Sequence, residues 1–124
     1  MHVITHLGEY RVKHIGPHVM VLHDEELPAL IRGNFCAYYQ EGRRHREGAP
    51  AVFYPDGKIA HYINGELHNE HGAAVEWPSG AKLYAIKGKW HRTDGPALIT
   101  HTGMCFWFVN GKRMTKEAFD AKFS

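Results

Sequence analysis

The sequence predicts an all-β protein, an elongated antiparallel sheet of stacked 23-residue β-hairpin repeats with a short C-terminal capping helix. Three columns of residues recur at this spacing: glycines at 42, 65, 88 and 111, histidines at 45, 68 and 91, and alanines at 51, 74 and 97. Such a period is typical of stacked supersecondary units, in which no repeat buries its apolar side alone. The 13 glycines and 12% aromatic residues also favour a turn-rich β fold.

The length predicts a single domain over residues 1–124, with a degenerate N-terminal cap at 1–34, repeats at 35–114 and a helix at 115–124. In the cap, apolar clusters at Val3–Ile4, Val19–Leu22 and Leu27–Ile31 predict short strands. Pro28–Ile31 has the same order of residue types as Pro96–Ile99. A worn copy of the repeat with a deletion is therefore expected here, since terminal repeats are often atypical.

Each repeat is punctuated by two turns. The first contains Gly57, Gly80 or Gly103 and leads into a run of β-forming residues at 59–63, 83–86 or 105–109, for which a strand of about six residues is expected. The second is a two-residue hairpin turn at Asn64–Gly65 and Asn110–Gly111, where both residues need positive φ. Glu41–Gly42 and Lys87–Gly88 are weaker copies. One repeat is thus predicted to form one long hairpin.

The last segment predicts a helix through Ser124. Thr115 is placed to cap it, Glu117 lies in the first turn, and Phe119 and Phe123 share one face. We expect this helix to act as a lid on the last repeat, because an open sheet edge invites pairing with another chain.

The sequence resembles the MORN-repeat variants common in bacteriophage and bacterial proteins. Those units carry an aromatic strand, Asn-Gly, then His-Arg-x-Asp-Gly-Pro-Ala, which residues 88–97 match best and residues 44–51 match in part. The similarity covers about residues 35–114. It implies stacked hairpins and a binding role, with no defined activity, and it suggests a phage-encoded protein that inhibits a host or defence component.

Composition restricts the location and the partners. A net charge of +2 is too small to imply nucleic-acid binding by itself. The longest apolar run, Met104–Val109, is too short to cross a membrane, and the N-terminus lacks the pattern of a signal peptide. Cys36 and Cys105 lack the spacing of a zinc site and fit a reducing compartment. We therefore expect a cytoplasmic protein, in the host cytoplasm if phage-encoded, without membrane contact.

The histidine column is predicted to be structural, without a metal or another cofactor. With two strands per repeat, column histidines lie roughly 10 Å apart, whereas a metal needs nitrogens about 2 Å from its centre. Each histidine is expected to hydrogen-bond the turn ahead of Gly72 or Gly95. His91 with Asp94, or His68 with Glu70, could form an acid–base pair. No nucleophile accompanies them, so the protein is not expected to be an enzyme, and Asp94 is predicted to bond its own backbone.

Strand alternation provides the candidate binding residues. Ala37, Ala60, Leu83 and Phe106 would face one way, and Tyr38, His61, Tyr84 and Trp107 would form an aromatic ladder on the other. Trp77, Trp90, Arg44 and Arg92 complete the set of predicted partner-binding residues, because aromatic and arginine side chains are favoured at interface hot spots. The ladder could equally be half of a two-layer core. The opposite face is expected to pack on the N-terminal strands or on a twin molecule, which predicts a homo-oligomer.

These patterns predict a non-catalytic module that binds another protein, such as a host or defence enzyme. The alternative is a nucleic-acid-contacting module using basic residues that recur around the hairpin turns. These residues are Arg43, Arg44, Arg46, Lys58, Lys82, Lys87, Lys89, Arg92, Lys112 and Arg113. A salt series separates the two hypotheses, since binding to phosphates weakens steeply as salt rises.

Overall fold

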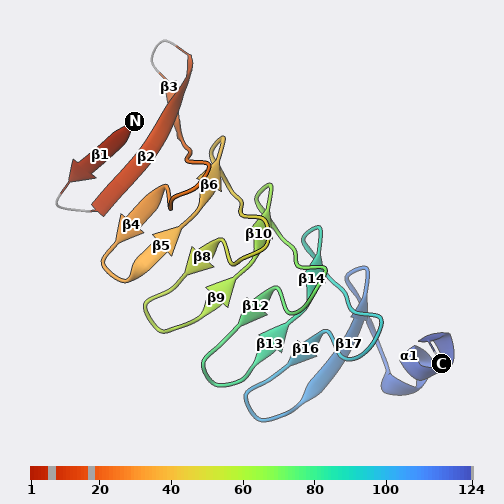
Figure 1. Cartoon of the computed structure of the whole chain (residues 1–124). Helices are drawn as coiled ribbons and strands as arrows, with labels where there is room; N and C mark the ends of the chain where they lie inside the picture. The colour runs from red at the N-terminus through yellow and green to blue at the C-terminus, as the bar shows by residue number, and fades with distance from the viewer. Residues whose placement is uncertain (6–7, 17–18, 124) are drawn as a thin grey trace. The chain divides into compact units, whose positions relative to one another are not determined.

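The computed structural model describes residues 1–5, 8–16 and 19–123 of the chain. As predicted, strands in antiparallel hairpins make up most of it, with one short helix at the C-terminal end (Figure 1). Its contacts divide the chain into two units, Met1–Glu66 and Leu67–Ser124, which are described separately below. The prediction of a single cooperative domain stays a prediction.

Unit 1 contains the N-terminal strands and the first repeats. In its sheet, the strand order is β1 (His2–Thr5), β2 (Gly8–Gly16), β4 (Leu30–Arg32), β5 (Phe35–Ala37), β8 (Val52–Phe53) and β9 (Ile59–Ala60), and β3 (Val19–Leu22) also pairs with β2. A separate two-stranded ladder joins β6 (Tyr39–Gln40) to β7 (Arg43–Arg44). The division between the units falls in β11 (Glu66–Leu67), which follows β10 (Tyr62–Ile63).

Unit 2 repeats this pattern and ends in the helix. The order in its sheet is β12 (Val75–Glu76), β13 (Lys82–Leu83), β16 (Leu98–Ile99), β17 (Cys105–Val109) and β18 (Lys112–Met114). A two-stranded ladder joins β14 (Ala85–Ile86) to β15 (Lys89–Trp90). The helix α1 (Lys116–Phe123) follows β18, and the predicted end of the helix at Ser124 lies outside the described residues.

Each repeat forms two hairpins, so the prediction of one long hairpin with strands of about six residues is wrong. The strand breaks at one residue, Tyr38 in unit 1 and Tyr84 in unit 2. The N–H of Tyr38 donates to the carbonyl of Ala51 at 2.7 Å, while its own carbonyl accepts from the N–H of His45 at 3.0 Å. The N–H and the carbonyl of one residue thus bond to two different strands. The strict alternation of side chains between the two faces is therefore interrupted at this residue. Only β17 continues unbroken over five residues among the described repeats.

The predicted turns are confirmed. Glu41, Asn64, Lys87 and Asn110 have φ between 49° and 51°, and each is followed by a glycine with φ between 79° and 82°. Both central residues therefore have positive φ, as a two-residue hairpin turn requires. The wider turns also match, since Gly57, Gly80 and Gly103 have φ between 87° and 95° and each N–H donates to the carbonyl three residues earlier.

The core consists mainly of small residues. The alanine column is fully buried, with Ala29, Ala51, Ala74 and Ala97 each at 0% exposure. Val52 and Val75, which follow two of them, are also buried. Burial of single methyl groups lets successive strands approach closely, and each repeat on its own contributes little apolar area. The stability of a repeat therefore depends on its neighbours.

The N-terminal segment extends the sheet of unit 1, which corrects the expectation that it packs on a face. Glu9 and Tyr10 of β2 pair with Ile31 and Leu30 of β4. The predicted worn repeat is present, and its deletion lies in the turn between β4 and β5. Four residues separate the strand partners Ile31 and Cys36, whereas five separate the equivalent partners Phe53 and Ile59. Strand β2 was not predicted, although Tyr10 and Val12 alternate with Glu9, Arg11 and Lys13.

The helix α1 begins as predicted. The side-chain oxygen of Thr115 accepts from the N–H of Ala118 at 3.1 Å, which is an N-cap hydrogen bond. Phe119 is buried and its ring lies 4.8 Å from that of Phe123, so both occupy one face, and the helix contacts β17 of the last repeat. Cys36 on β5 and Cys105 on β17 are free thiols.

Candidate functional site

The histidine column links each repeat to the next hairpin turn. The N–H of Asn64 donates to Nδ1 of His45, that of Lys87 to His68, and that of Asn110 to His91, each at 2.9 Å. Each of these rings therefore accepts a backbone hydrogen bond. The predicted target, the turn ahead of Gly72 or Gly95, is wrong, because the ring reaches forward to the positive-φ residue nineteen positions later.

A fourth histidine belongs to this column. The N–H of Glu41 donates to Nδ1 of His23 at 3.0 Å, at a separation one residue shorter, which the deletion in the turn after β4 explains. At the other end of the chain, Met114 occupies the column position. The helix α1 follows it directly, in the place of a further hairpin turn.

The second ring nitrogen of most column histidines faces a glutamate two residues later. Nε2 lies 3.6 Å from Glu47 in His45 and 3.3 Å from Glu70 in His68. Because Nδ1 accepts a hydrogen bond, the neutral ring carries its proton on Nε2 and can donate it to the carboxylate. Across residues 1–5, 8–16 and 19–123, no three His, Cys, Asp or Glu side chains converge on a position that could hold a metal ion.

The residue after each column histidine closes a loop. Nη1 of Arg46 donates to the carbonyl of Pro50 at 3.2 Å, Nη1 of Arg92 to that of Pro96 at 3.1 Å, and Nδ2 of Asn69 to that of Ala73 at 2.9 Å. Arginine and asparagine therefore supply an N–H to the same backbone position, which explains how the column tolerates both. Asp94 instead accepts from Nε of Arg92 at 2.9 Å, so its predicted bond to its own backbone is replaced by a side-chain pair.

Two of these arginines also stack on the tyrosines at the strand breaks. The guanidinium carbon lies 3.9 Å from the ring centroid in both pairs, Arg46 over Tyr38 and Arg92 over Tyr84. Cations at this distance are attracted to the face of an aromatic ring. The stack fixes both side chains, because each arginine is also held by its carbonyl partner.

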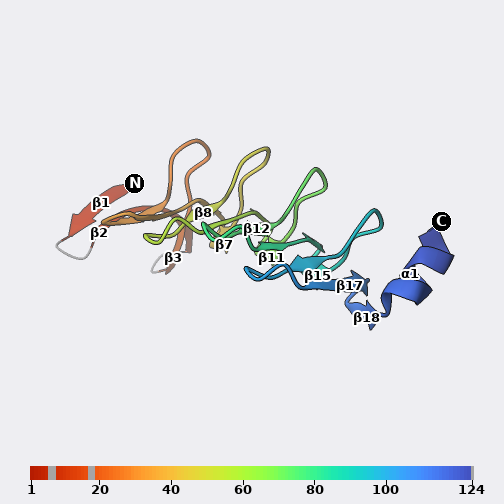
Figure 2. The same cartoon turned by 90° about the horizontal axis from the view of Figure 1, so that it is seen from below.

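Each unit has a groove over such a stack. The groove in unit 1 has a volume of about 300 Å³ and is lined by Asp24, Glu25, Glu26, Tyr38, Gln40, His45, Arg46 and Glu47. The groove in unit 2 has about 510 Å³ and is lined by Asn69, Glu70, His71, Gly72, Tyr84, Ile86, His91, Arg92, Thr93 and Asp94. The two linings correspond position by position, two repeats apart. In each unit the loops beside the groove project to one side of the strands (Figure 2).

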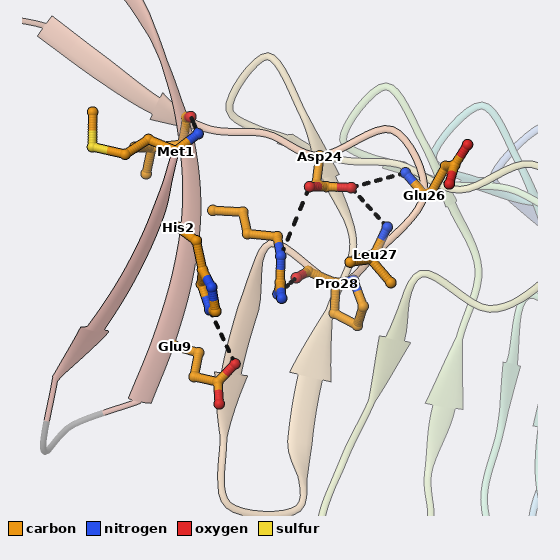
Figure 3. Close-up of polar contacts among 9 residues, drawn as sticks. Met1, His2, Glu9, Asp24, Glu26, Leu27 and Pro28 are labelled. Atoms are coloured by element: carbon orange, nitrogen blue, oxygen red, sulfur yellow. Dashed lines mark hydrogen bonds and ion pairs between the residues drawn. The ribbon is translucent and has the colours of Figure 1, made fainter.

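Asp24 organises the first of these loops. Its Oδ1 accepts from the N–H of Leu27 at 2.8 Å and from that of Glu26 at 2.9 Å (Figure 3). These two hydrogen bonds, with a weaker contribution from Arg11, lower the pKa of its carboxyl below the ordinary value. Nη1 of Arg11 in turn donates to the carbonyl of Pro28 at 2.9 Å. The negative charge of Asp24 is therefore held at the wall of the groove.

The predicted binding residues lie in different places. Tyr38, Tyr84 and Arg92 belong to the grooves, and His61 occupies the break between β9 and β10. Nε of Arg44 donates to the hydroxyl of Tyr39 at 3.3 Å, and its guanidinium lies over Tyr62.

The three tryptophans do not share one surface. Trp77 lines an apolar depression with Leu98 and Ile99, and Trp107 lines another with Phe106 and Met114. Trp90 is 37% exposed and packs against Phe108.

Sequence reasoning missed the acidic walls of the grooves. The signal was present, because carboxylates recur within three residues after the column histidine: Asp24, Glu25, Glu26, Glu47, Glu70 and Asp94. The pairing of Tyr38 with Arg46 and of Tyr84 with Arg92 was also visible in the sequence. In the repeat between them, the tyrosine position is His61 and the arginine position is Asn69, so the two positions change together. Both signals are repeats of residue type at a fixed spacing.

Searches of protein-family models, curated proteins and solved structures find no match for this chain. Among the described residues no helix is long and apolar enough to span a membrane.

Proposed function

We propose that this protein is a non-catalytic binding module whose grooves hold cationic segments of a partner protein. The observation that carries the proposal is the repeated groove, with a stacked Tyr–Arg pair as its floor and carboxylates along its walls. An ordered tyrosine buries a large contact area at a small entropy cost, which is why tyrosine is frequent at interface hot spots.

The charges of the walls support a basic partner. In unit 1 the side chains of Glu25 and Glu47 are 82% and 83% exposed, beside the held carboxylate of Asp24. Exposed carboxylates attract lysine and arginine side chains and repel phosphate groups. The grooves therefore favour a protein partner over a nucleic acid.

The chemistry of the column histidines supports a binding role over catalysis. A general base needs a free ring nitrogen within reach of the proton that it removes. Nδ1 of His45 and of His91 accepts a backbone N–H in each case, so this nitrogen serves the fold. The resemblance to MORN-repeat variants agrees with this role and favours a phage-encoded inhibitor of a host or defence component in the host cytoplasm.

The experiment combines capture of a partner with the placement of a positive charge in each groove. The full chain is used to capture partners from a lysate, and the affinity of each captured protein is then measured by calorimetry for the wild type, Glu26→Lys and Thr93→Lys. Both positions line grooves, and their side chains form no ion pair within the described residues. Glu66→Lys is the matched control, because Glu66 is exposed and lies outside both grooves.

We expect at least a tenfold loss of affinity for Glu26→Lys or Thr93→Lys, with folding unchanged by circular dichroism, and no loss for Glu66→Lys. Tenfold corresponds to about 1.4 kcal/mol, within the range for a charged contact at an interface. A captured partner that binds all three variants equally would show that the grooves are not the binding site.

A further inference from the structure

Unit 2 has a second surface that shares no residue with its groove. It lies on two hairpins, β14–β15 and β17–β18, and we call it the basic hairpin surface. Its members are all exposed: Lys87, Lys89, Trp90, Lys112 and Arg113.

The two hairpins contact each other directly. The N–H of Gly111 in the second turn donates to the carbonyl of Trp90 at 2.8 Å. A Cβ at Gly111 would lie 3.8 Å from Cβ of Lys89, so the turn rests on the neighbouring strand. The ring of Trp90 meets that of Phe108 edge to face, with centroids 5.1 Å apart. The indole is thus held in place while part of it stays open to solvent.

The positive charge of this surface is not neutralised. Neither hairpin contains an aspartate or a glutamate, and none of the four cations forms an ion pair with any residue in the described part of the chain. Of the other four cations of unit 2, Lys82, Arg92 and Lys116 each face a carboxylate within 4 Å. The fourth, Lys122, lies over the ring of Phe123. Overall, unit 2 has eight basic and five acidic residues, whereas unit 1 has seven and eight.

Equivalent positions in unit 1 carry charges of both signs. Glu41 stands where unit 2 has Lys87, and the position of Lys89 is occupied by Arg43 in one hairpin and by Glu66 in the next. Nζ of Lys13 donates to Glu41 at 2.6 Å, so even this hairpin turn is neutralised. The fold of the hairpin therefore accepts either sign, and the concentration of lysine in unit 2 is not a requirement of the repeat.

Lys87 also occupies a strained position. Its φ is 49°, a conformation that asparagine tolerates better than lysine, and asparagine is the residue at the matching positions 64 and 110. Backbone strain at an exposed residue is a reason to look for a function of its side chain.

We propose that the basic hairpin surface binds single-stranded nucleic acid. Trp90 would stack on an unpaired base while Lys87, Lys89, Lys112 and Arg113 contact the phosphates on either side. A cationic surface with an exposed aromatic ring is the arrangement by which proteins bind single strands without sequence preference. A duplex keeps its bases stacked on one another and offers no free face to the indole, so the exposed part of Trp90 favours a single strand.

Fluorescence anisotropy of a labelled oligothymidylate of about 20 nucleotides tests the proposal with the full chain. Affinity should fall as salt rises from about 50 to 200 mM, with a slope of log K against log salt of about −3 for four phosphate contacts. Trp90→Leu removes the stacking face but keeps an apolar contact with Phe108, and should weaken binding by about tenfold.

Two double variants test whether binding depends on the basic hairpin surface or only on the net charge of the protein. Lys89→Gln with Lys112→Gln should weaken binding and reduce the magnitude of the salt slope by about 1.4. Arg43→Gln with Lys58→Gln makes the same change of charge in unit 1 and should leave the affinity unchanged. Lys87→Asn should raise the melting temperature and weaken binding, because it removes the strain together with a phosphate contact.

The proposal is wrong if the oligonucleotide does not bind at about 50 mM salt, or if Trp90→Leu binds as tightly as the wild type. It is also wrong if a duplex of the same length or poly-glutamate competes as well as the single strand, since either result would indicate a surface for polyanions in general. Loss of protein partners in the groove variants does not bear on this test, because the two surfaces share no residue.

Discussion

The link between the histidine column and the next hairpin turn can be tested at His45. This side chain is 10% exposed, and its Nδ1 accepts the N–H of Asn64 at 2.9 Å. His45→Leu keeps most of the buried volume but removes the acceptor. The net loss for such a hydrogen bond is about 1 kcal/mol, and it rises to about 3 kcal/mol if the N–H of Asn64 finds no water.

A matched variant separates the hydrogen bond from the packing. His45→Asn places an amide oxygen near the position of Nδ1, so the N–H of Asn64 keeps an acceptor. We expect His45→Asn to be more stable than His45→Leu by about 1 kcal/mol, even though asparagine is the more polar residue. This order is opposite to the order expected from burial of apolar area alone.

Urea unfolding followed by far-ultraviolet circular dichroism measures both variants, with equal m-values as the check that the comparison is valid. Met114→His serves as a control, because the helix α1 follows Met114 directly and a histidine there should add no stability. The reasoning fails if His45→Leu unfolds within about 0.5 kcal/mol of the wild type, or if His45→Asn is no more stable than His45→Leu.

Four further predictions concern stability, assembly and metal content. Because the pKa of Asp24 is lower in the folded state, its charge stabilises the fold above the unfolded pKa of about 3.9, and this contribution is lost as the pH falls through the lower folded pKa. In Asp24→Asn, the urea midpoint should therefore change less with pH below about 4 than it does in the wild type. Arg46→Gln should keep an N–H for Pro50 but lose the stack on Tyr38, at a cost of about 0.5–1 kcal/mol in urea unfolding. Light scattering should show a homo-oligomer at high concentration, and a monomer throughout would contradict the expected self-association. Elemental analysis of untagged protein should find no stoichiometric zinc or nickel after dialysis, since Nδ1 of the column histidines serves the backbone.

The local structure of the repeats can be predicted from the amino-acid sequence alone. The positive-φ turns, the cap of α1 at Thr115 and the buried alanine column all follow from residues within one turn or one period. Their chemistry acts over a few residues: a glycine or an asparagine permits positive φ, a threonine oxygen accepts a helix N–H, and a methyl group fits between close strands. For these features the residue type and the spacing were sufficient.

The joining of the repeats and the position of the grooves depend on contacts between residues that are distant in the sequence. The break at Tyr38 depends on an N–H that bonds to Ala51 and a carbonyl that bonds to His45. The target of each histidine is a backbone N–H in the following hairpin. Backbone groups are the same in every residue, so no pattern of side chains shows which of them will pair. The choice is made by the packing of one repeat against the next, and that packing sets the tyrosine, the arginine and the carboxylates around one groove.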